Sequence, residues 1–292
     1  MIKYDCHLHT SFSSDSKTPP EVQIERAIEL GMKGMCITDH MDREFPNLER
    51  SGMSFVFEPD EYFPKMQELK EKYKDRIDLL IGIELGLRNE PECRDRINEW
   101  YDELLGAYPF DFAIGSTHCL EFTDPYYSSP YWDDKDAKKG IRVYFEAVLE
   151  NITRFNGYDS VGHLDYLIRY VPEHRLKADG RLYTINDIYD PREYFDILDE
   201  ILKKLIDNGK ALEINTAGLK YGLGYPHPHT TILKRYMELG GEMITIGSDG
   251  HRPEHLCYGF REAREMMESL GFKYQCVFKA RKPVMYHIDD RA

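Results

Sequence analysis

The sequence has 292 residues, of which 41% are hydrophobic and 31% are charged. This balance is ordinary for a globular protein that buries a sizeable core, and it excludes a chain dominated by disorder. The formal net charge of -14 argues against binding to nucleic acid, because the phosphate backbone attracts clustered lysine and arginine.

Short β-rich runs alternate with longer segments in which apolar residues recur about every 3.6 positions. The predicted strands are, in chain order, residues 2–6, 34–38, 79–85, 112–117, 160–164, 211–215 and 243–248, with a weaker one at 284–287. The predicted helices between them are residues 20–30, 60–73, 94–107, 139–154, 192–208 and 254–270. This alternation is typical of repeated βα units around a largely parallel sheet. No Gly-, Ser- or Pro-rich linker interrupts it, so we expect a single domain over residues 1–292.

Three further features concern location and loops. The N-terminal residues MIKYDCHLHT contain no apolar core preceded by positive charge, and no window approaches the ~18 apolar residues of a spanning helix. Six cysteines lack any C-x-x-C pair, so we expect reduced thiols in a cytoplasmic protein with no membrane partner. Residues 42–59 and 122–138 each follow a strand that carries a histidine and are long for βα loops, so we expect them to roof a site.

Histidines and carboxylates recur in pairs where the predicted strands end. In an extended strand, residues two apart point to the same side, so His7 and His9 present two imidazoles to one point. The same spacing returns in HLD at 163–165 and in DGH at 249–251. Single candidates at or near other strand ends are Asp15, His40, Glu84 and His118. Because active sites of βα barrels lie at the carboxyl ends of the strands, this clustering predicts a metal site.

The ligand types indicate which metals and which chemistry to expect. Imidazole and carboxylate without paired thiolates favour divalent Zn, Mn or Fe, and the ligands are too many for one ion. Neighbouring ions activate a shared water and stabilise both oxygens of an in-line displacement. The residues alone therefore predict metal-dependent hydrolysis, with a phosphate ester as the natural substrate.

The order of the motifs H-x-H, T-D-H, a strand Glu, S-T-H, G-H-x-D and S-D-x-H resembles the PHP (polymerase and histidinol phosphatase) superfamily over nearly the whole chain. The segments HLHTSFSSDS, GHLDYLIRY, ALEINTAGL and SDGHRPE are similar to the stand-alone histidinol-phosphate phosphatases of that superfamily. The resemblance implies a distorted (βα)7 TIM-like barrel of the α/β class, with three metal ions at the carboxyl ends of the strands.

The resemblance also implies how the ligands are divided among the ions. The first ion would be held by His7, His9, Glu84 and Asp249. Glu84 would bridge to a second ion held by His118 and His163, and the third would be held by Asp15, His40 and His251. Other members can carry a histidine where this chain has Asp15, so the aspartate could alter the metal preference without abolishing the site.

The surrounding acids and the reaction can be assigned in outline. We expect Asp39 and Asp165 either to accept hydrogen bonds from ligand imidazoles, fixing their tautomers, or simply to cap strand ends. Physics and the resemblance both favour a metal-bridging hydroxide as the nucleophile, with no serine or cysteine required. Asp249 would orient that hydroxide or take its proton, and His251 or His40 would assist the leaving alkoxide.

Contacts to the substrate are harder to predict. A phosphate near the metals favours basic side chains, for which we select Arg154, Arg169 and Lys220. Asn215, at the end of a strand that otherwise lacks a ligand, could hydrogen-bond an imidazole or amine of the substrate. The HPH segment at 227–229 follows no strand, so we do not assign it as a ligand pair.

We also do not assign His174, His255 or His287, which have no partner at strand spacing, and for them we expect structural roles. As the resemblance implies, the prediction is an L-histidinol-phosphate phosphatase of histidine biosynthesis acting on a small-molecule monoester. One alternative is another PHP phosphoesterase acting on nucleotides or DNA 3′ ends, and the acidic charge disfavours the DNA version. A second alternative is a non-enzymatic metal-binding module, against which the intact ligand set counts. The sequence leaves the oligomeric state open.

Overall fold

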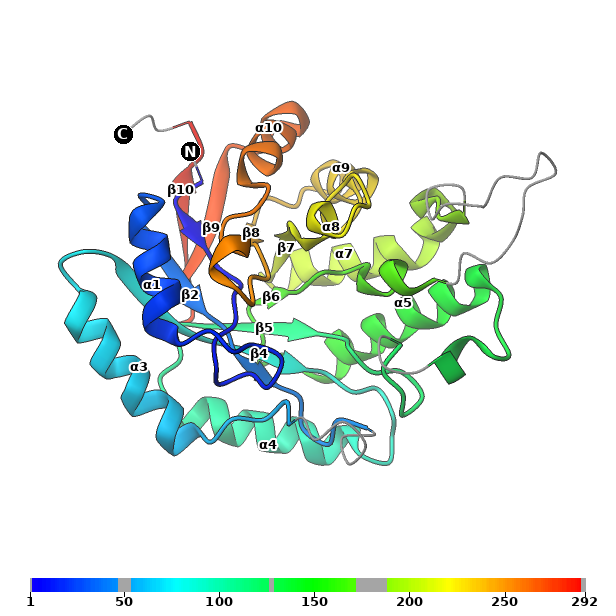
Figure 1. Ribbon diagram of the computed structural model, residues 1–292. Coiled ribbons are helices and arrows are strands. Elements are labelled where there is room, and N and C mark those ends of the chain that lie inside the picture. Colours follow the sequence, from blue (N-terminus) through cyan, green and yellow to red (C-terminus); the bar gives the residue numbers. More distant parts are fainter. Residues whose placement is uncertain (1, 47–53, 126–128, 172–187, 290–292) are drawn as a thin grey trace.

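The computed structural model describes residues 2–46, 54–125, 129–171 and 188–289, and its strands form the inner layer of an α/β barrel (Figure 1). The barrel strands are β1 (Tyr4–Asp5), β2 (Gly34–Ile37), β3 (His40–Met41), β4 (Asp78–Gly86), β5 (Phe112–Ser116), β6 (Ser160–Val161), β7 (Ala211–Asn215) and β8 (Ile244–Gly247). Seven of them pair in parallel in the order β1-β2-β4-β5-β6-β7-β8, and β3 extends the line of β2 alongside β4.

The first and last barrel strands come together through backbone hydrogen bonds. Cys6 N–H donates to Ile246 O at 2.9 Å, and Asp249 N–H donates to His7 O at 2.8 Å. The sheet is therefore a nearly closed parallel barrel, and the predicted distorted barrel is confirmed. In β4, eight of the nine residues are buried, since both faces of the strand are covered. This explains why its sequence is a continuous apolar run without alternation.

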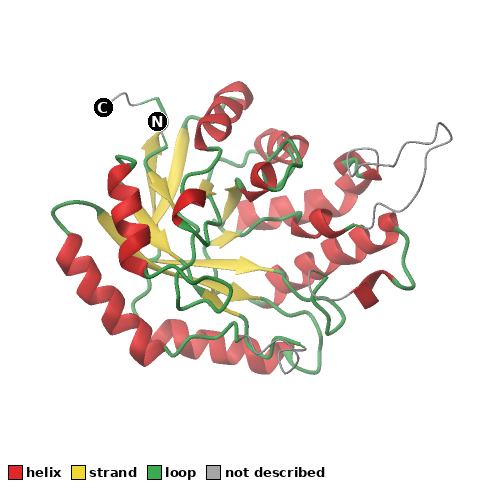
Figure 2. Cartoon of the chain, in the orientation of Figure 1, coloured by secondary structure: helices red, strands yellow, loops and turns green. Residues whose placement is uncertain are grey.

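The helices lie on the outer side of the strands (Figure 2). They are α1 (Pro20–Glu29), α3 (Pro59–Tyr73), α4 (Arg94–Ala107), α5 (Ala137–Arg154), α7 (Phe195–Asp207), α8 (Ala217–Lys220), α9 (Thr230–Glu238) and α10 (Phe260–Leu270). Short 3-10 turns are η1 (Ser129–Trp132), η2 (Tyr166–Tyr170), η3 (Pro191–Tyr194) and η4 (Pro253–His255). The apolar face of α7 is buried through Ile197, Leu198, Ile201, Leu202 and Leu205. This spacing follows the helical period, so burial of one face explains why the segment is helical.

The predicted helix over 254–270 was wrong in its first part. The chain there forms η4, then turns, and α10 begins only at Phe260. Cys257 and Gly259 adopt positive φ angles of 56° and 69°. A right-handed helix cannot pass through left-handed backbone, so it is interrupted between the two segments.

A C-terminal hairpin covers one end of the barrel. It consists of β9 (Tyr274–Lys279), which was not predicted, and β10 (Lys282–His287), which contains the weak strand predicted at 284–287. The two strands are antiparallel, and side chains of β9 share a core cluster with interior side chains of the barrel. Asp111, just before β5, accepts a hydrogen bond from Ala280 N–H at 3.0 Å. The hairpin therefore lies against the amino-terminal ends of the strands, and their carboxyl ends face the other way.

Two expectations about the whole chain can be compared with the structure. The cysteines are all free thiols, and five of the six are buried as core residues. In the part of the chain that the structure describes, no helix combines the length and the apolar character needed to cross a bilayer.

Candidate metal centre

The predicted ligands meet at the carboxyl ends of the barrel strands. Each is placed there by the strand that precedes or contains it, because parallel strands in a barrel direct their carboxyl ends to the same face. The nine residues are His7, His9, Asp15, His40, Glu84, His118, His163, Asp249 and His251. Two of them, His163 and Asp249, have positive φ angles of 20° and 53°. Such backbone is uncommon for residues other than glycine and often accompanies functional sites.

Glu84 lies at the centre of the cluster with its two oxygens directed to different histidines. Its Oε2 lies 3.2 Å from His7 Nε2 and 3.0 Å from His40 Nδ1. Its Oε1 lies 3.0 Å from His163 Nε2 and 3.3 Å from His118 Nε2. The carboxylate is fully buried and thus has the placement expected of a group shared between two ion positions.

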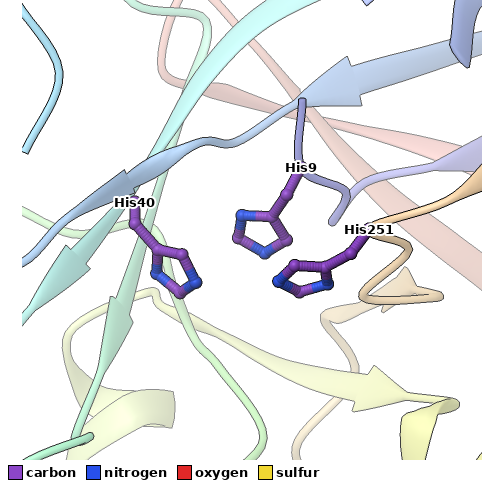
Figure 3. A group of neighbouring side chains, drawn as sticks. All are labelled: His9, His40 and His251. Carbon is purple, nitrogen blue, oxygen red and sulfur yellow. The ribbon is translucent and has the colours of Figure 1, made fainter. Parts of the chain in front are cut away.

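The remaining ligands surround Glu84 on the side of β1 and β8. His9 Nε2 lies 3.4 Å from Asp249 Oδ1, and His251 Nε2 lies 2.9 Å from Asp15 Oδ2. The rings of His9, His40 and His251 gather in one place (Figure 3), with centroids 4.2 Å apart for His9 with each of the other two. His40 directs Nδ1 to Glu84 and Nε2 to Asp15, at 3.5 Å, so it lies between two of the predicted ligand sets.

The donor set fits divalent cations. The Nε2 atoms of His7 and His9 and the Oε2 atom of Glu84 are buried and have no hydrogen-bond partner among the described residues. Lone pairs that face one another at such distances repel unless a proton or a cation lies between them, and imidazole with carboxylate suits Zn, Mn or Fe. Three groups have ligand atoms within 4.8 Å of one another: His9, His40 and His251; His7, His9 and Asp249; and His40, Glu84 and His118.

The local electrostatics differ among the histidines. Burial lowers the pKa of His9 to about 3, and His251 and His40 act in the same direction, so the His9 imidazole is neutral at pH 7. Burial also lowers the pKa of His118, but Asp42 and Glu84 outweigh it and raise that pKa to about 10. A neutral imidazole is ready to bind a cation, whereas a protonated one must release its proton first.

Two buried carboxylates that the sequence analysis missed contact the Nδ1 atoms of predicted ligand histidines, on the side of the ring that faces away from the cluster. Asp42 Oδ1 lies 2.6 Å from His118 Nδ1, and Glu213 Oε1 lies 2.6 Å from His7 Nδ1. A signal for Asp42 was present in the sequence, because it follows His40 by two residues in an extended segment. Glu213 could be found only from its partner strands, because β7 contributes none of the nine ligands.

Of the two roles expected for Asp39 and Asp165, hydrogen bonds from ligand imidazoles are not found among the described residues, whereas the capping alternative fits Asp39, whose Oδ1 accepts the backbone N–H of Thr10 at 2.7 Å. Asp39 accepts a hydrogen bond from Ser13 Oγ at 2.7 Å, and Ser13 Oγ lies 3.3 Å from His9 Nδ1, so any influence on that ligand is indirect. Adjacent residues of extended chain point to opposite sides, which turns Asp39 away from the cluster that His40 enters.

Asp165 holds a histidine that is not among the predicted ligands. Its Oδ1 lies 2.5 Å from His227 Nδ1, and its Oδ2 accepts a hydrogen bond from His229 N–H at 2.8 Å. The positive φ of His163 ends the strand geometry, so Asp165 does not share the side of His163. The HPH segment thus contacts Asp165, and neither of its histidines lines the cavity described below.

A cavity of about 430 Å³ opens beside the cluster. Its lining includes the predicted substrate residues Arg169 and Lys220 together with His255 and Arg252, which were not predicted to be there. The described parts of both long loops contribute to it through Phe45, Phe55 and Asp124, while residues 47–53 and 126–128 lie outside the described residues. His255 thus lies at the cavity, and the structural role expected for it stays a prediction. His174 lies outside the described residues.

Two of the predicted substrate residues do not line the cavity. Arg154 is the exposed last residue of α5. A helix that follows a barrel strand runs back toward the amino-terminal ends, so its last residue lies at the opposite face from the cluster. Asn215 is buried and donates hydrogen bonds to Glu213 Oε2 at 3.2 Å and to Asp249 Oδ2 at 3.4 Å. The prediction that these two side chains contact the substrate was wrong.

Arg169 is held at the cavity by aromatic rings. Its guanidinium carbon lies 4.5 Å from the ring centroid of Tyr221 and 4.7 Å from that of Tyr166. Its Nε is buried without a hydrogen-bond partner in the described part of the chain. Lys220 Nζ donates to the backbone oxygen of Asp249 at 3.1 Å, which places its charge next to the cluster.

Comparisons with known proteins agree with this geometry. Residues 5–217 match the PHP domain family. A histidinol-phosphatase of Lactococcus lactis is 33% identical, with 97% of this chain and 96% of that protein covered. A probable histidinol-phosphatase of Clostridium acetobutylicum is 34% identical, with 92% and 94% covered.

Solved structures show the same relationship. The crystal structure of the Lactococcus lactis histidinol phosphate phosphatase, complexed with zinc, L-histidinol and phosphate, superposes with a TM-score of 0.80 at 32% identity, covering 97% of this chain and 98% of that chain. A putative histidinol phosphatase of Listeria monocytogenes shares the fold, with a TM-score of 0.70 at 22% identity over 89% of this chain and 99% of that chain. The chain therefore belongs to the PHP domain family.

Proposed function

We propose that the chain is a metal-dependent L-histidinol-phosphate phosphatase that cleaves the monoester to L-histidinol and phosphate, as a step of histidine biosynthesis. One observation carries the proposal: seven of the nine residues of the cluster line the same cavity as the cationic side chains of Arg169, Lys220 and Arg252. The Lactococcus lactis relative, similar over nearly the whole chain, has this name, and its structure contains zinc, L-histidinol and phosphate.

The proposal includes three divalent ions, with zinc, manganese and iron as candidates. The first position would use His7, His9, Glu84 and Asp249, the second Glu84, His118 and His163, and the third Asp15, His40 and His251. Bound divalent ions would offset the charge of the phosphate and lower the pKa of water at the site.

Arg169 and Lys220 are the side chains that we assign to the phosphate. The rings of Tyr166 and Tyr221 orient the guanidinium of Arg169, so its planar N–H donors are in position before the substrate binds. Burial lowers the pKa of Lys220, and the carboxylate of Asp249 opposes that shift only in part. The Nζ of Lys220 lies at the cavity, where it donates to the backbone oxygen of Asp249 at 3.1 Å. Together they would hold the nonbridging oxygens of a small monoester.

Asp249 and His251 are the groups that we assign to orienting the water and to proton transfer. Burial raises the pKa of Asp249, but His7, His9 and His251 outweigh it and keep the carboxyl ionised, so it can accept a hydrogen bond that orients the attacking water. His251 Nδ1 lies 3.5 Å from Asp249 Oδ1, and its side chain is 23% exposed at the cavity. His251 is thus placed to pass a proton to the leaving oxygen, and His40, which is 11% exposed, is its neighbour in that role.

Steady-state kinetics on a substrate panel tests the proposal. The panel contains L-histidinol phosphate, p-nitrophenyl phosphate, nucleoside monophosphates and single-stranded DNA with a 3′ phosphate, each with Zn, Mn and Fe. We expect the highest kcat/KM for L-histidinol phosphate and little turnover of DNA, since the net charge of -14 opposes DNA binding. If L-histidinol phosphate turned over no faster than p-nitrophenyl phosphate, the substrate assignment would be refuted.

A further inference from the structure

Glu213 of β7 contacts ligands that we assign to two different ions. Its Oε1 lies 2.6 Å from His7 Nδ1, and its Oε2 accepts the backbone N–H of His163 at 2.7 Å. Only 1% of the residue is exposed. We propose that Glu213 is a positioning residue that prepares the first and second ion positions together. This inference rests on the metal site of the proposed function and does not depend on the identity of the substrate.

The contact with His7 fixes which ring nitrogen can bind a cation. A carboxylate only accepts hydrogen bonds, so the Nδ1 of His7 that faces Glu213 carries a proton. The other nitrogen, Nε2, faces Glu84 Oε2 at 3.2 Å. Glu213 therefore directs the metal-binding nitrogen of His7 into the cluster, as carboxylates behind ligand histidines do in metal sites.

The contact with His163 acts on the backbone. His163 has a positive φ, and its turn directs Nε2 to Glu84 Oε1 at 3.0 Å. The N–H of this turn lies within the protein, where it needs an acceptor, and Glu213 Oε2 supplies one. The second oxygen of Glu213 thus holds a ligand of the second ion position in its unusual conformation.

The groups around the Glu213 side chain are hydrogen-bond donors. A third donor, the Nδ2 of Asn215, also points to Oε2 at 3.2 Å. The chain leaves room at Gly247, where a Cβ would lie 2.7 Å from Oε1 and 2.2 Å from the Cβ of His7. Every described hydrogen-bond contact of the carboxylate is therefore with a donor, and an amide at this position would place its NH2 group against one of them.

Glu213→Gln is the sharpest test because it keeps the size and removes one acceptor. We expect equilibrium competition with a zinc-binding dye, and metal analysis after dialysis, to show a loss of zinc affinity of about 10- to 100-fold. The variant should lose zinc from the first ion position, which uses His7, and from the second, which uses His163, at the same zinc concentration. Zinc affinity equal to that of the wild type in a folded variant would overturn the inference.

Asp159→Asn is the matched control. Asp159 is also a buried carboxylate that accepts a backbone hydrogen bond, from Ala113 N–H at 2.9 Å, but it lies before β6 and pairs with Arg281 at the other end of the barrel. We expect it to lower thermal stability without lowering zinc affinity. If both variants lost zinc equally, the effect of Glu213 would be one of stability alone, and the inference would fail.

A measurement on the wild type decides the matter even if Glu213→Gln does not fold. In zinc-loaded protein with 15N-labelled histidine, we expect His7 to carry its proton on Nδ1 and to bind zinc through Nε2. A proton on Nε2 would overturn the inference while leaving zinc binding intact. Wild-type protein that holds no zinc would instead refute the proposed metal site, and the inference with it.

Discussion

His118 Nδ1 lies 2.6 Å from Asp42 Oδ1, and both side chains are buried. Burial raises the pKa of the Asp42 carboxyl, but His118 and His40 outweigh it and hold that pKa below its ordinary value. The carboxylate therefore keeps its charge behind the imidazole and accepts the proton of Nδ1. The Nε2 of His118 is left to face Glu84, at 3.3 Å.

Asp42→Asn should weaken the ion position that uses His118. An amide can donate to Nδ1 as well as accept from it, so the orientation and tautomer of the ring are no longer fixed. We expect metal affinity to fall by about 10- to 100-fold and kcat to fall more than KM rises, because Arg169 and Lys220 are untouched. Asp111→Asn, at the opposite end of the barrel, is the control for loss of a buried carboxylate. Unchanged metal content and kcat in Asp42→Asn would contradict the prediction.

Arg169→Lys should impair phosphate binding although it keeps the positive charge. Lysine has neither the planar fork that binds two oxygens nor the flat face that packs on Tyr166 and Tyr221. We expect kcat/KM for L-histidinol phosphate to fall by about 10- to 100-fold, since a charge-assisted hydrogen bond is worth about 1.5–3 kcal/mol. Arg154→Lys, on the exposed end of α5, should leave kcat/KM unchanged. Equal effects of the two substitutions would refute the assignment of Arg169.

The sequence predicted the barrel because each βα unit carries its own local pattern. β4 is a buried apolar run, and α7 shows a clear helical period, so both can be predicted from the local sequence without knowing which elements they pack against. β9 pairs locally with β10, but it was missed because its packing against the barrel interior is a long-range feature. The turn at Cys257 was missed because its positive φ is set by tertiary contacts, and cysteine does not signal it.

The same distinction applies to the site. The clustering of the nine predicted ligands could be foreseen because each lies at or near a strand end, where parallel topology brings distant residues together. Glu213 could not, since its role comes from His7 and His163 on other elements. Arg154 was misplaced although it ends the predicted helix 139–154, because the choice rested on its charge and not on the direction in which a helix runs after a barrel strand.

Asp78 ties the C-terminal hairpin to the barrel, and its loss should show a characteristic pH dependence. Lys279 Nζ and Tyr4 Oη both donate to Asp78 Oδ2, at 2.5 Å and 2.7 Å. Burial raises the pKa of the Asp78 carboxyl, but these two donors outweigh it and lower the pKa below its ordinary value. A carboxyl with a lowered pKa in the folded state stabilises the protein above its unfolded pKa, about 3.9, and this contribution is lost as the pH falls further.

Asp78→Asn should therefore lower the free energy of unfolding near pH 7 by about 1 kcal/mol or less, because the pair is partly exposed and solvent screens it. Urea denaturation between pH 3 and 7 should show the difference from the wild type shrinking below about pH 4. Glu25→Gln, which removes an exposed partner of Arg76, should leave the pH profile of stability unchanged. A difference for Asp78→Asn that is constant over this pH range would contradict the role of its charge.

Removal of metal should lower the thermal stability of the protein, and substitution of a residue in the cluster should reduce this loss. An ion that binds only the folded state stabilises it, by about 2.7 kcal/mol at a free concentration 100 times Kd. For a chain of this size we expect chelation to lower Tm by about 5–10 °C and added zinc to restore it. His9→Ala should reduce this shift, because the neutral imidazole of His9 faces both Glu84 and Asp249. His287→Ala, on the hairpin at the other end, should leave the shift as large as in the wild type. Differential scanning fluorimetry with and without chelator measures all three proteins, and a wild-type Tm indifferent to metal would argue against a multinuclear site.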